Sequence, residues 1–334
     1  MNLHLNTGEK RPDGFHDIES LFLALAFGDT LYIETTAPAR SLEIHMNWQL
    51  PDDYPVVRAI PPEKNLISRA VDLFRDRTGY EEGLKISVEK RIPPGGGLGG
   101  GSSDAAAVFL ALNYLASSGC ADGIGADGGL LDVAGLAELA ASVGSDVPFF
   151  IYNCSAAWVS GRGERVVPVT LPEAVFGLSF LLINAGFRSD TAEAYRQLDL
   201  YRKTCFPKVL SQRHKDTEEG EMSACGTFGD KLLQSLSGPP CDWPFSNDFL
   251  PVFIMLENNS PHSEKAFAYR ERLSGLRKLG ADFTGLSGSG STCFGVFLDR
   301  NVAATARKNL LKQWRFVIET FPLAPRTIRC YNQE

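Results

Sequence analysis

The amino-acid sequence predicts a two-domain protein of the α/β or α+β class. Its 334 residues exceed what one hydrophobic core usually organises, so two packed domains are expected. Segments with the alternation of a β-strand and segments with the spacing of an amphipathic helix follow one another along the chain. Hydrophobic residues make up 44% of the sequence and charged residues 22%, which is enough apolar material for globular cores.

The first third of the chain contains two predicted strands with a helix between them. Apolar residues alternate with polar ones over residues 42–48 and again over residues 84–88. Over residues 65–75, apolar side chains recur at helical spacing. This order of strand, helix and strand is typical of a mixed α and β domain.

Two helices and an insertion follow. Residues 104–116 are rich in strong helix formers, and residues 136–143 continue with a second helix that Gly144 can cap. The glycine-rich stretch between them, assigned to residues 116–134, predicts a surface insertion.

The C-terminal half shows a composition break and then further strands and helices. Residues 203–240 contain a polar, aperiodic stretch at 211–230 that predicts a poorly ordered loop. Residues 179–184 and 292–298 predict apolar strands, and residues 303–314 a helix.

Charge and composition exclude several classes of function. The chain carries 33 basic and 40 acidic residues, a net charge of −7, without a block of Lys and Arg, so nucleic acid is not an expected partner. Its seven cysteines contain no C-x-x-C pair, and the histidines show no metal-ligand spacing, so no structural metal site is expected. No apolar run reaches the roughly 18 residues that span a bilayer, so we expect a cytoplasmic protein without membrane contact.

The most informative stretch is residues 92–107, IPPGGGLGGGSSDAAA, where a predicted strand leads through six glycines into a helix. Glycines let the backbone approach phosphate oxygens, and the N-terminus of the helix favours negative charge. Serine hydroxyls at the start of the helix can donate to phosphate or help to hold Mg²⁺. The residues expected to bind a nucleotide here are Pro94, Gly95, Gly96, Gly97, Leu98, Gly99, Gly100, Gly101, Ser102 and Ser103.

Two better-known glycine loops do not fit this stretch. Gly95, Gly97 and Gly100 satisfy the dinucleotide-binding pattern. However, two prolines separate the strand from the glycines, and no strand that ends in an acidic residue follows the helix at the expected distance, so that fold is not expected. A Walker loop requires a lysine before its Ser or Thr, and none follows Gly101. A mobile glycine linker is the commoner alternative, but linkers rarely join a strand to a serine-capped helix.

Five motifs in order resemble the diphosphocytidyl-methylerythritol kinase family, within the galactokinase, homoserine, mevalonate and phosphomevalonate kinase superfamily. They are residues 93–103 in the triple-glycine form, RPDGFHDIESLF at 11–22, GSDVPFF at 144–150, SNDF at 246–249 and LSGSGSTCFGVF at 286–297. The resemblance implies an α+β fold of two domains, with an ATP-binding domain at 1–172 and a substrate-side domain at 173–334. It also implies ATP and Mg²⁺ as cofactors and transfer of the γ-phosphate to an alcohol, the 2-hydroxyl of a cytidine diphosphate-linked methylerythritol.

The resemblance assigns roles to single residues. Asp146 would accept or orient the proton of the attacking hydroxyl, although an aspartate before proline is also common in turns. His16 would hydrogen-bond cytosine while Phe15 and Tyr195 stack on it, although alone a loop histidine is more often solvated and such a tyrosine more often core. Thr191 precedes Tyr195 by four residues on the same predicted helix and is assigned to the substrate side.

Weaker assignments complete the set. Gly288, Ser289 and Gly290 would form a second nest of backbone donors near the substrate diphosphate, with a plain β-turn as the alternative. Further candidates, each equally explained as a surface polar residue, are Asn65 and Lys90 for the adenine edge and Asn2 and Asp13 for the erythritol side.

Two alternative functions remain open at this point. A mevalonate or homoserine kinase would keep the glycine loop but not the aromatic and histidine set at Phe15, His16 and Tyr195. The other is a nucleotide-binding homologue with impaired transfer. In the family a lysine stands two residues before the counterpart of Asn2, and this sequence contains no residue at that position. Met1 occupies the position between them, so we expect that lysine directly upstream of residue 1, unless Lys10 replaces it.

Overall fold

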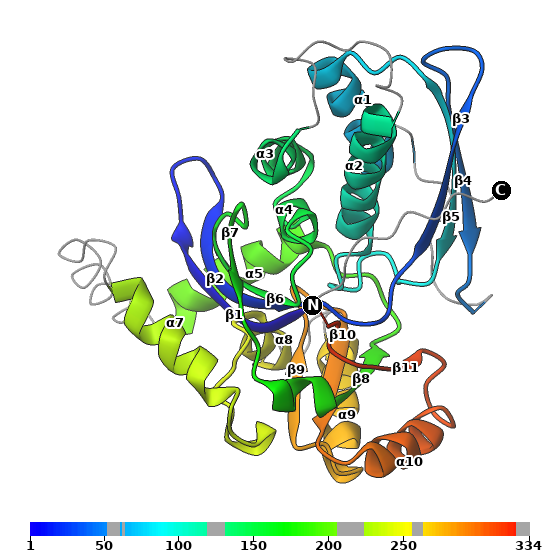
Figure 1. The fold of residues 1–334 in the computed structure, drawn as a ribbon. Helices are drawn as coiled ribbons and strands as arrows, with labels where there is room; N and C mark the ends of the chain where they lie inside the picture. Colours follow the sequence, from blue (N-terminus) through cyan, green and yellow to red (C-terminus); the bar gives the residue numbers. More distant parts are fainter. Residues whose placement is uncertain (52–60, 62–63, 119–130, 206–223, 256–262, 325–334) are drawn as a thin grey trace.

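The computed structural model describes residues 1–51, 61, 64–118, 131–205, 224–255 and 263–324. Their strands form three sheets with the orders β1-β2-β6-β7, β11-β8-β10-β9 and β3-β5-β4. Figure 1 shows the three-stranded sheet with its helices in one half of the molecule and the two four-stranded sheets in the other. Within the described ranges, no helix is long and apolar enough to cross a membrane.

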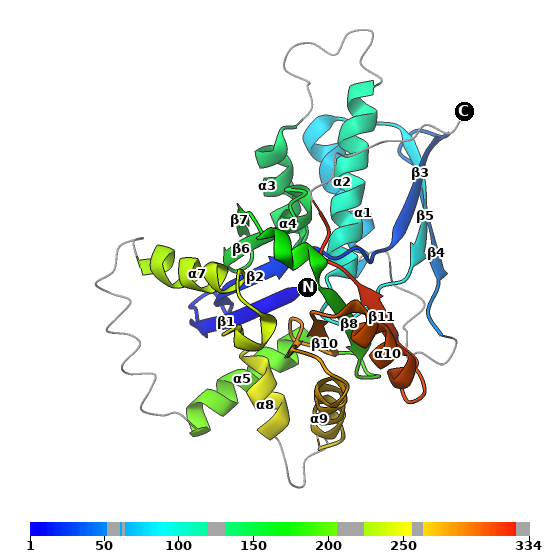
Figure 2. The ribbon, with the colours of Figure 1, turned by 60° about the horizontal axis from the view of Figure 1, so that its bottom comes forward.

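The first half is a helical layer on a three-stranded sheet. β5 (Gly83–Lys90) lies between β3 (Thr30–Thr36), which is antiparallel to it, and β4 (Leu42–Trp48), which is parallel. The helices α1 (Leu66–Thr78), α2 (Gly100–Ser118), α3 (Val133–Val143) and α4 (Val147–Ile151) lie on one face of this sheet (Figures 1 and 2).

Alternation explains how this layer packs. Leu84, Ile86 and Val88 of β5 are buried against the helices, while Lys85 and Ser87 between them remain partly exposed. Each apolar side chain buried in this way contributes about 1.5–3 kcal/mol relative to an exposed one. The sheet therefore fixes the end of β5, from which the glycine loop departs.

The second half contains two antiparallel sheets. One consists of β1 (Asn2–Lys10), β2 (His16–Leu23), β6 (Ala156–Gly161) and β7 (Arg165–Val169). The other consists of β11 (Val317–Thr320), β8 (Ser179–Asn184), β10 (Thr292–Phe297) and β9 (Phe283–Leu286). Around them lie α5 (Thr191–Cys205), α7 (Ala224–Ser235), α8 (Phe249–Met255), α9 (Ser263–Lys278), α10 (Arg300–Leu310) and the short 3-10 helices η3 (Glu173–Gly177) and η4 (Pro240–Asp242).

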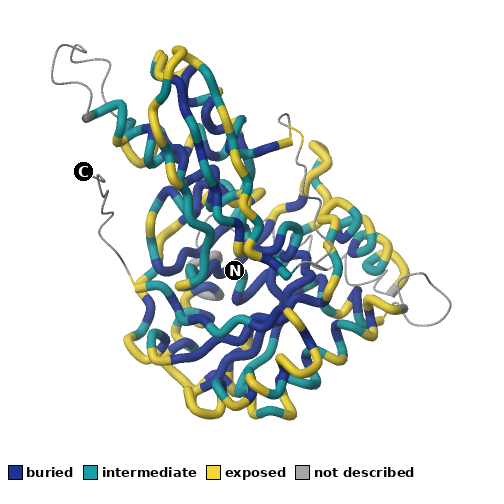
Figure 3. The backbone as a smooth tube through the Cα atoms, turned by 90° about the vertical axis from the view of Figure 1, so that its right-hand side faces the viewer, coloured by how far each residue is buried: buried dark blue, intermediate teal, exposed yellow. Residues whose placement is uncertain are grey.

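The two antiparallel sheets share their cores. Every residue of β8 and β10 is buried, and Figure 3 shows buried segments in the interior with exposed ones around them. One apolar cluster contains Leu5 and Phe22 from the first sheet together with Leu181 and Phe249 from later segments. The expected domain division at 172/173 stays a prediction, since side chains from both sides of it pack together.

Most of the predicted elements are confirmed, and two expectations are wrong. Part of the stretch expected to be a loop forms α7, because Leu232 supplies a buried anchor that the polar composition concealed. The helix expected to reach residue 314 ends at Leu310. Of the expected insertions at 116–134 and 203–240, residues 116–118 belong to α2, 133–134 to α3 and 203–205 to α5, whereas 119–130 and 206–223 lie outside the described residues.

β1 departs from simple alternation. His4 is as buried as Leu3 and Leu5, because its ring stacks on Trp158 with centroids 6.1 Å apart. Both faces of this strand are therefore covered, which places the start of the chain deep between the two halves of the molecule.

Candidate active site

The glycine loop connects the end of β5 at Lys90 to the start of α2 at Gly100. Three of its glycines, Gly95, Gly97 and Gly99, have φ angles of 69°, 74° and 70°, a region that residues with a side chain rarely adopt. At Gly97 a Cβ atom would also collide with the carbonyl oxygen of Ser287. The loop therefore requires glycine for its conformation and for its close contact with the second half.

Three successive carbonyls of the loop accept hydrogen bonds from that second half. The carbonyls of residues 95–97 bind, in order, the N–H of Ser189 at 3.0 Å, the N–H of Thr292 at 3.0 Å and the hydroxyl of Ser287 at 2.7 Å. Carbonyl oxygens repel phosphate, and here three of them are turned toward the C-terminal segments. The backbone N–H groups of the loop are the polar groups that suit an anion.

A cavity of about 610 Å³ lies over this loop, within the size range of small-molecule sites. Its lining comes from both halves: residues 93–102, Met46 and Trp48 of β4, the start of α1, and Arg188 after β8. Apolar walls beside a glycine loop match what a nucleotide base and its phosphates require.

The two candidates for the adenine edge both line this cavity, but each has a structural task. Asn65 caps α1, because its Oδ1 accepts the N–H of Ile67 at 3.0 Å. The Lys90 ammonium donates to Asp104 at 2.7 Å and also to Asp29. Their assignment to adenine stays a prediction, and the lysine charge is already compensated.

Lys90, Asp29 and Asp104 form a buried ion triad beneath the loop, each with a side chain at most 5% exposed. Burial raises the pKa of the Asp104 carboxyl, Lys90 opposes this shift and the second carboxylate, Asp29, adds to it. Asp29 also accepts the N–H groups of Arg91 and Ile92. The triad thus joins the end of β5 to the first turn of α2.

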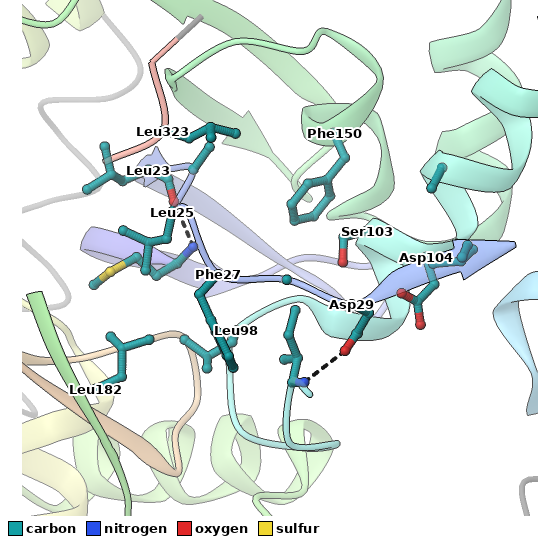
Figure 4. A pocket seen from close by; sticks show the side chains of 16 residues that line it. Leu23, Leu25, Phe27, Asp29, Leu98, Ser103, Asp104, Phe150, Leu182 and Leu323 are labelled. Atoms are coloured by element: carbon teal, nitrogen blue, oxygen red, sulfur yellow. Dashed lines mark hydrogen bonds between the residues drawn. The ribbon is translucent and has the colours of Figure 1, made fainter. Parts of the chain in front are cut away.

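A second, mostly apolar cavity of about 210 Å³ lies behind the glycine loop. Figure 4 shows Leu25, Phe27 and Leu98 toward one end and Ser103 with the two triad aspartates toward the other. Ser103 donates to the carbonyl of Gly100 at 3.0 Å and lines this rear cavity, whereas Ser102 lines the larger one. The two serines therefore do not occupy equivalent positions.

Asp146 stands at the N-terminus of α4 and makes no capping hydrogen bond there. Its side chain reaches solvent, yet the surrounding protein removes enough hydration to raise the pKa of its carboxyl, an effect that the nearby Met1 amino group opposes. A carboxylate with a raised pKa that is not committed to a structural bond can take up a proton.

Residues 288–290, predicted to form a second nest, lie against the glycine loop. The N–H of Gly290 donates to the carbonyl of Ser287 at 3.0 Å, as in the β-turn that was the alternative, and anion binding by this segment stays a prediction. Ser287 Oγ, which binds Gly97, also accepts the N–H of Asn2 at 3.2 Å. Ser289 Oγ lies 3.0 Å from Thr191 Oγ1. The structure therefore brings together the glycine loop, Asn2, Thr191 and residues 288–290.

Asn247 of the SNDF motif holds this second nest in place. Its Nδ2 donates to the carbonyls of Leu286 and Gly288, both at 2.8 Å. The neighbouring Asp248 accepts the N–H of Thr7 and a bond from Arg202, each at 2.9 Å. The motif thus ties the second nest to β1 and α5.

The hairpin between β1 and β2 presents Phe15, whose ring is 53% exposed. The guanidinium of Arg162, from the turn after β6, lies 5.1 Å from the centre of that ring. Asp13 accepts the N–H of Phe15 at 3.1 Å and pairs with Arg11. Asp13 is therefore placed beside Phe15, at the opposite end of the hairpin from Asn2.

His16 is buried and held on two sides. Its Nε2 lies 2.8 Å from Asp199 Oδ1, and its ring stacks on Tyr195 with centroids 4.7 Å apart. Tyr195 in turn meets the edge of Phe249. Burial raises the pKa of Tyr195 to about 12, with Asp146 adding to the shift. Tyr195 thus packs on His16 in this structure, and its predicted stacking on cytosine stays a prediction.

Several residues of the site were not singled out in the sequence. Ser287, Arg162, Arg188, Asp199 and Asp29 are brought to it by segments far apart in the chain. Only Ser287 lay within a motif already identified. Among the described residues, no group of three or more His, Cys, Asp or Glu side chains converges to hold a metal.

Comparison with known proteins agrees with this geometry. Residues 65–154 match the GHMP kinases N terminal domain, and residues 248–315 match the GHMP kinases C terminal domain. A crystal structure of L. major mevalonate kinase superposes with a TM-score of 0.55 at 14% identity, covering 92% of this chain and 90% of that one, which shows the shared fold. Fold and site together define a small-molecule kinase of the GHMP class.

Closer relatives specify the family. The chain is 32% identical over 314 residues to 4-diphosphocytidyl-2-C-methyl-D-erythritol kinase of Treponema pallidum, covering 94% of this chain and 93% of the relative. It is 34% identical to the enzyme of that name from Solibacter usitatus, covering 90% and 80%. A crystal structure of 4-(cytidine 5'-diphospho)-2C-methyl-D-erythritol kinase superposes with a TM-score of 0.64 at 28% identity, covering 96% of each chain. The chain belongs to the 4-diphosphocytidyl-2-C-methyl-D-erythritol kinase family.

Proposed function

We propose that this protein transfers the γ-phosphoryl group of ATP to the 2-hydroxyl of 4-diphosphocytidyl-2-C-methyl-D-erythritol. The observation that carries the proposal is the glycine loop under a cavity of about 610 Å³, with Ser287 bound against it. Asp146 stands at the start of α4, whose Phe150 lies beside Gly99 of the loop. Relatives that carry this name cover nearly the whole chain. The acceptor hydroxyl forms a bond to the γ-phosphorus, the bond to the ADP oxygen breaks, and the hydroxyl proton leaves.

Asp146 takes up that proton in the proposed reaction. Because its carboxyl has a raised pKa, it is a better base than an ordinary surface aspartate near neutral pH. Asp146 also adds to the raised pKa of Tyr195.

Mg²⁺ fits the oxygen donors of the large cavity. Magnesium in kinases is held by one or two protein oxygens together with the phosphates, and the hydroxyl of Ser102 lines the cavity at the start of α2. Asp104 is less suited, since it is bound to Lys90. When bound, the ion would neutralise charge on the transferred group.

A coupled assay of ADP release tests the proposed function. Diphosphocytidyl-methylerythritol, mevalonate and homoserine are compared at equal concentration, with ³¹P NMR of the product to locate the new phosphate. We expect turnover with the first acceptor alone. Turnover with mevalonate or homoserine would assign a different kinase of the superfamily, and ADP binding without turnover on any acceptor would indicate a homologue impaired in transfer.

A further inference from the structure

Arg188 is a basic residue of the large cavity that no motif identifies. It follows β8 and lies across the first glycine of the loop, so closely that a Cβ atom on Gly95 would collide with its Cγ. Its side chain lines the same cavity as residues 93–102. The stem of this arginine therefore packs on the loop, and the residue lines the cavity.

The guanidinium of Arg188 differs from the other basic groups of the cavity in its charge environment. Three basic residues line the cavity: Lys64, Lys90 and Arg188. The Lys90 charge is compensated by two carboxylates, whereas Lys64 is solvent-exposed just before the cap of α1 and does not pack on the glycine loop as Arg188 does. Arg188 forms no ion pair with any residue that the structure describes, although Asp190 and Glu193 share its smaller neighbouring pocket. Residues 92–103 contain no Lys or Arg to neutralise phosphate, and Arg91, just before them, pairs with Glu89.

The backbone on both sides of Arg188 is fixed. The carbonyl of Phe187 accepts a hydrogen bond from Ser291 Oγ, and the N–H of Ser189 donates to Gly95 at 3.0 Å. Ser189 Oγ also donates to the carbonyl of Ser289 at 2.6 Å. This segment is thus bound both to the glycine loop and to residues 289–291. Its backbone loses little further conformational entropy when Arg188 binds an anion.

We propose that Arg188 binds the polyphosphate of the nucleotide held in the large cavity and supplies the cation that the loop lacks. A guanidinium suits this task because its planar fork can donate two parallel hydrogen bonds to phosphate oxygens. The proposal rests on the nucleotide site of the proposed function but not on the identity of the acceptor.

Calorimetry of the full chain, without any acceptor, tests this assignment. Binding of Mg-ADP and of adenosine is measured for the wild type, Arg188→Gln, Arg188→Lys and the control Lys312→Ala. Lys312 lies on an exposed turn after α10 and contacts Asn309. The glutamine keeps much of the stem that packs on Gly95 but removes the charge, and the lysine keeps the charge without the fork.

We expect Arg188→Gln to raise the Kd for Mg-ADP about 10-fold or more, because one charge-assisted contact is lost. The Kd for adenosine should stay within about 2-fold, Arg188→Lys should recover part of the ADP affinity, and Lys312→Ala should match the wild type. An unchanged ADP affinity in Arg188→Gln, or equal losses for ADP and adenosine, would overturn the proposal. Absence of phosphoryl transfer with normal ADP binding would count against the proposed function alone.

Discussion

Ser287 Oγ donates a hydrogen bond of 2.7 Å to the carbonyl of Gly97, which joins segments 190 residues apart in the chain. The same oxygen accepts the N–H of Asn2. One buried hydroxyl therefore links the glycine loop, the second nest and the first strand, which are the three parts that must stay in register for phosphoryl transfer.

Replacing Ser287 by Ala should destabilise the protein and weaken nucleotide binding together. The change leaves the Asn2 N–H and the Gly97 carbonyl without this partner, so we expect the free energy of unfolding to fall by about 1–3 kcal/mol. Urea denaturation and the KM for ATP measure the two effects. Ser142→Ala, on the exposed face of α3, is the matched control. Wild-type values for both quantities in Ser287→Ala would contradict the linking role.

Asp146→Asn should remove turnover while ADP affinity is kept, because the carboxylate acts on the acceptor proton. Loss of a general base lowers kcat by about 100-fold or more. Asp76→Asn, on the exposed surface of α1, serves as the control. A kcat within a few-fold of the wild type would exclude this role.

The pH profile of kcat gives an independent check on Asp146. The reactive form is the carboxylate, so activity should fall as pH drops through a pKa that lies above the ordinary value of 3.8. In Asp146→Asn this acidic limb should disappear from the residual rate. If the acidic limb of the wild-type profile gave a pKa at or below the ordinary aspartate value, Asp146 would not be a base whose pKa is raised by loss of hydration.

Phe15→Ala and Tyr195→Ala should behave differently, although both aromatics were assigned to cytosine. Phe15 is 53% exposed, so its loss should leave stability nearly unchanged and raise the acceptor KM about 5- to 100-fold through lost stacking. Tyr195 packs on His16 and Phe249, so its removal should also lower the free energy of unfolding by about 2–3 kcal/mol. Thermal unfolding and both KM values separate the two cases, and equal stability losses would refute the distinction.

Lys90→Met should strongly destabilise the protein, because two buried carboxylates lose their shared cation. Breaking a buried ion pair from one side costs about 3–5 kcal/mol. The pKa of Asp104, already raised by burial, would rise further without the lysine. A folded-state pKa above the unfolded one means that stability falls as pH increases, so the deficit should be larger at pH 8 than at pH 5. A deficit independent of pH in urea titrations would contradict this account.

The local elements were predictable because their signals are local. Alternation identified β4 and β5, and six glycines before a stretch of strong helix formers identified the loop and α2. The expected serine cap is wrong, because α2 begins at Gly100 and the two serines lie in its first turn. The five motifs placed Asp146 and the second nest in the right order along the chain. The hydrophobic periodicity did not predict α7, whose buried leucine, Leu232, has polar residues around it in the sequence.

The tertiary partners of the site could not be predicted from spacing. Asp199 lies 183 residues from His16, and Asp29 lies 61 residues from Lys90. Isolated carboxylates of this kind look the same in sequence as solvated surface residues. Lys90 shows the consequence: its position suggested a ligand contact, while the fold uses its charge to bind two buried carboxylates.

The β1–β2 hairpin also sets a length scale for the acceptor. Asn2 pairs with Phe22 near the glycine loops, and His16 lies six residues earlier on β2, beside the exposed ring of Phe15. At about 3.3 Å per residue, the two ends are separated by about 20 Å. The length of this strand pair therefore sets how long the acceptor must be. An alcohol that is too short cannot contact both ends at once, and it loses the binding energy of the contacts at the far end. Selectivity for a long, extended acceptor would then arise from the spacing of a backbone as much as from any single contact.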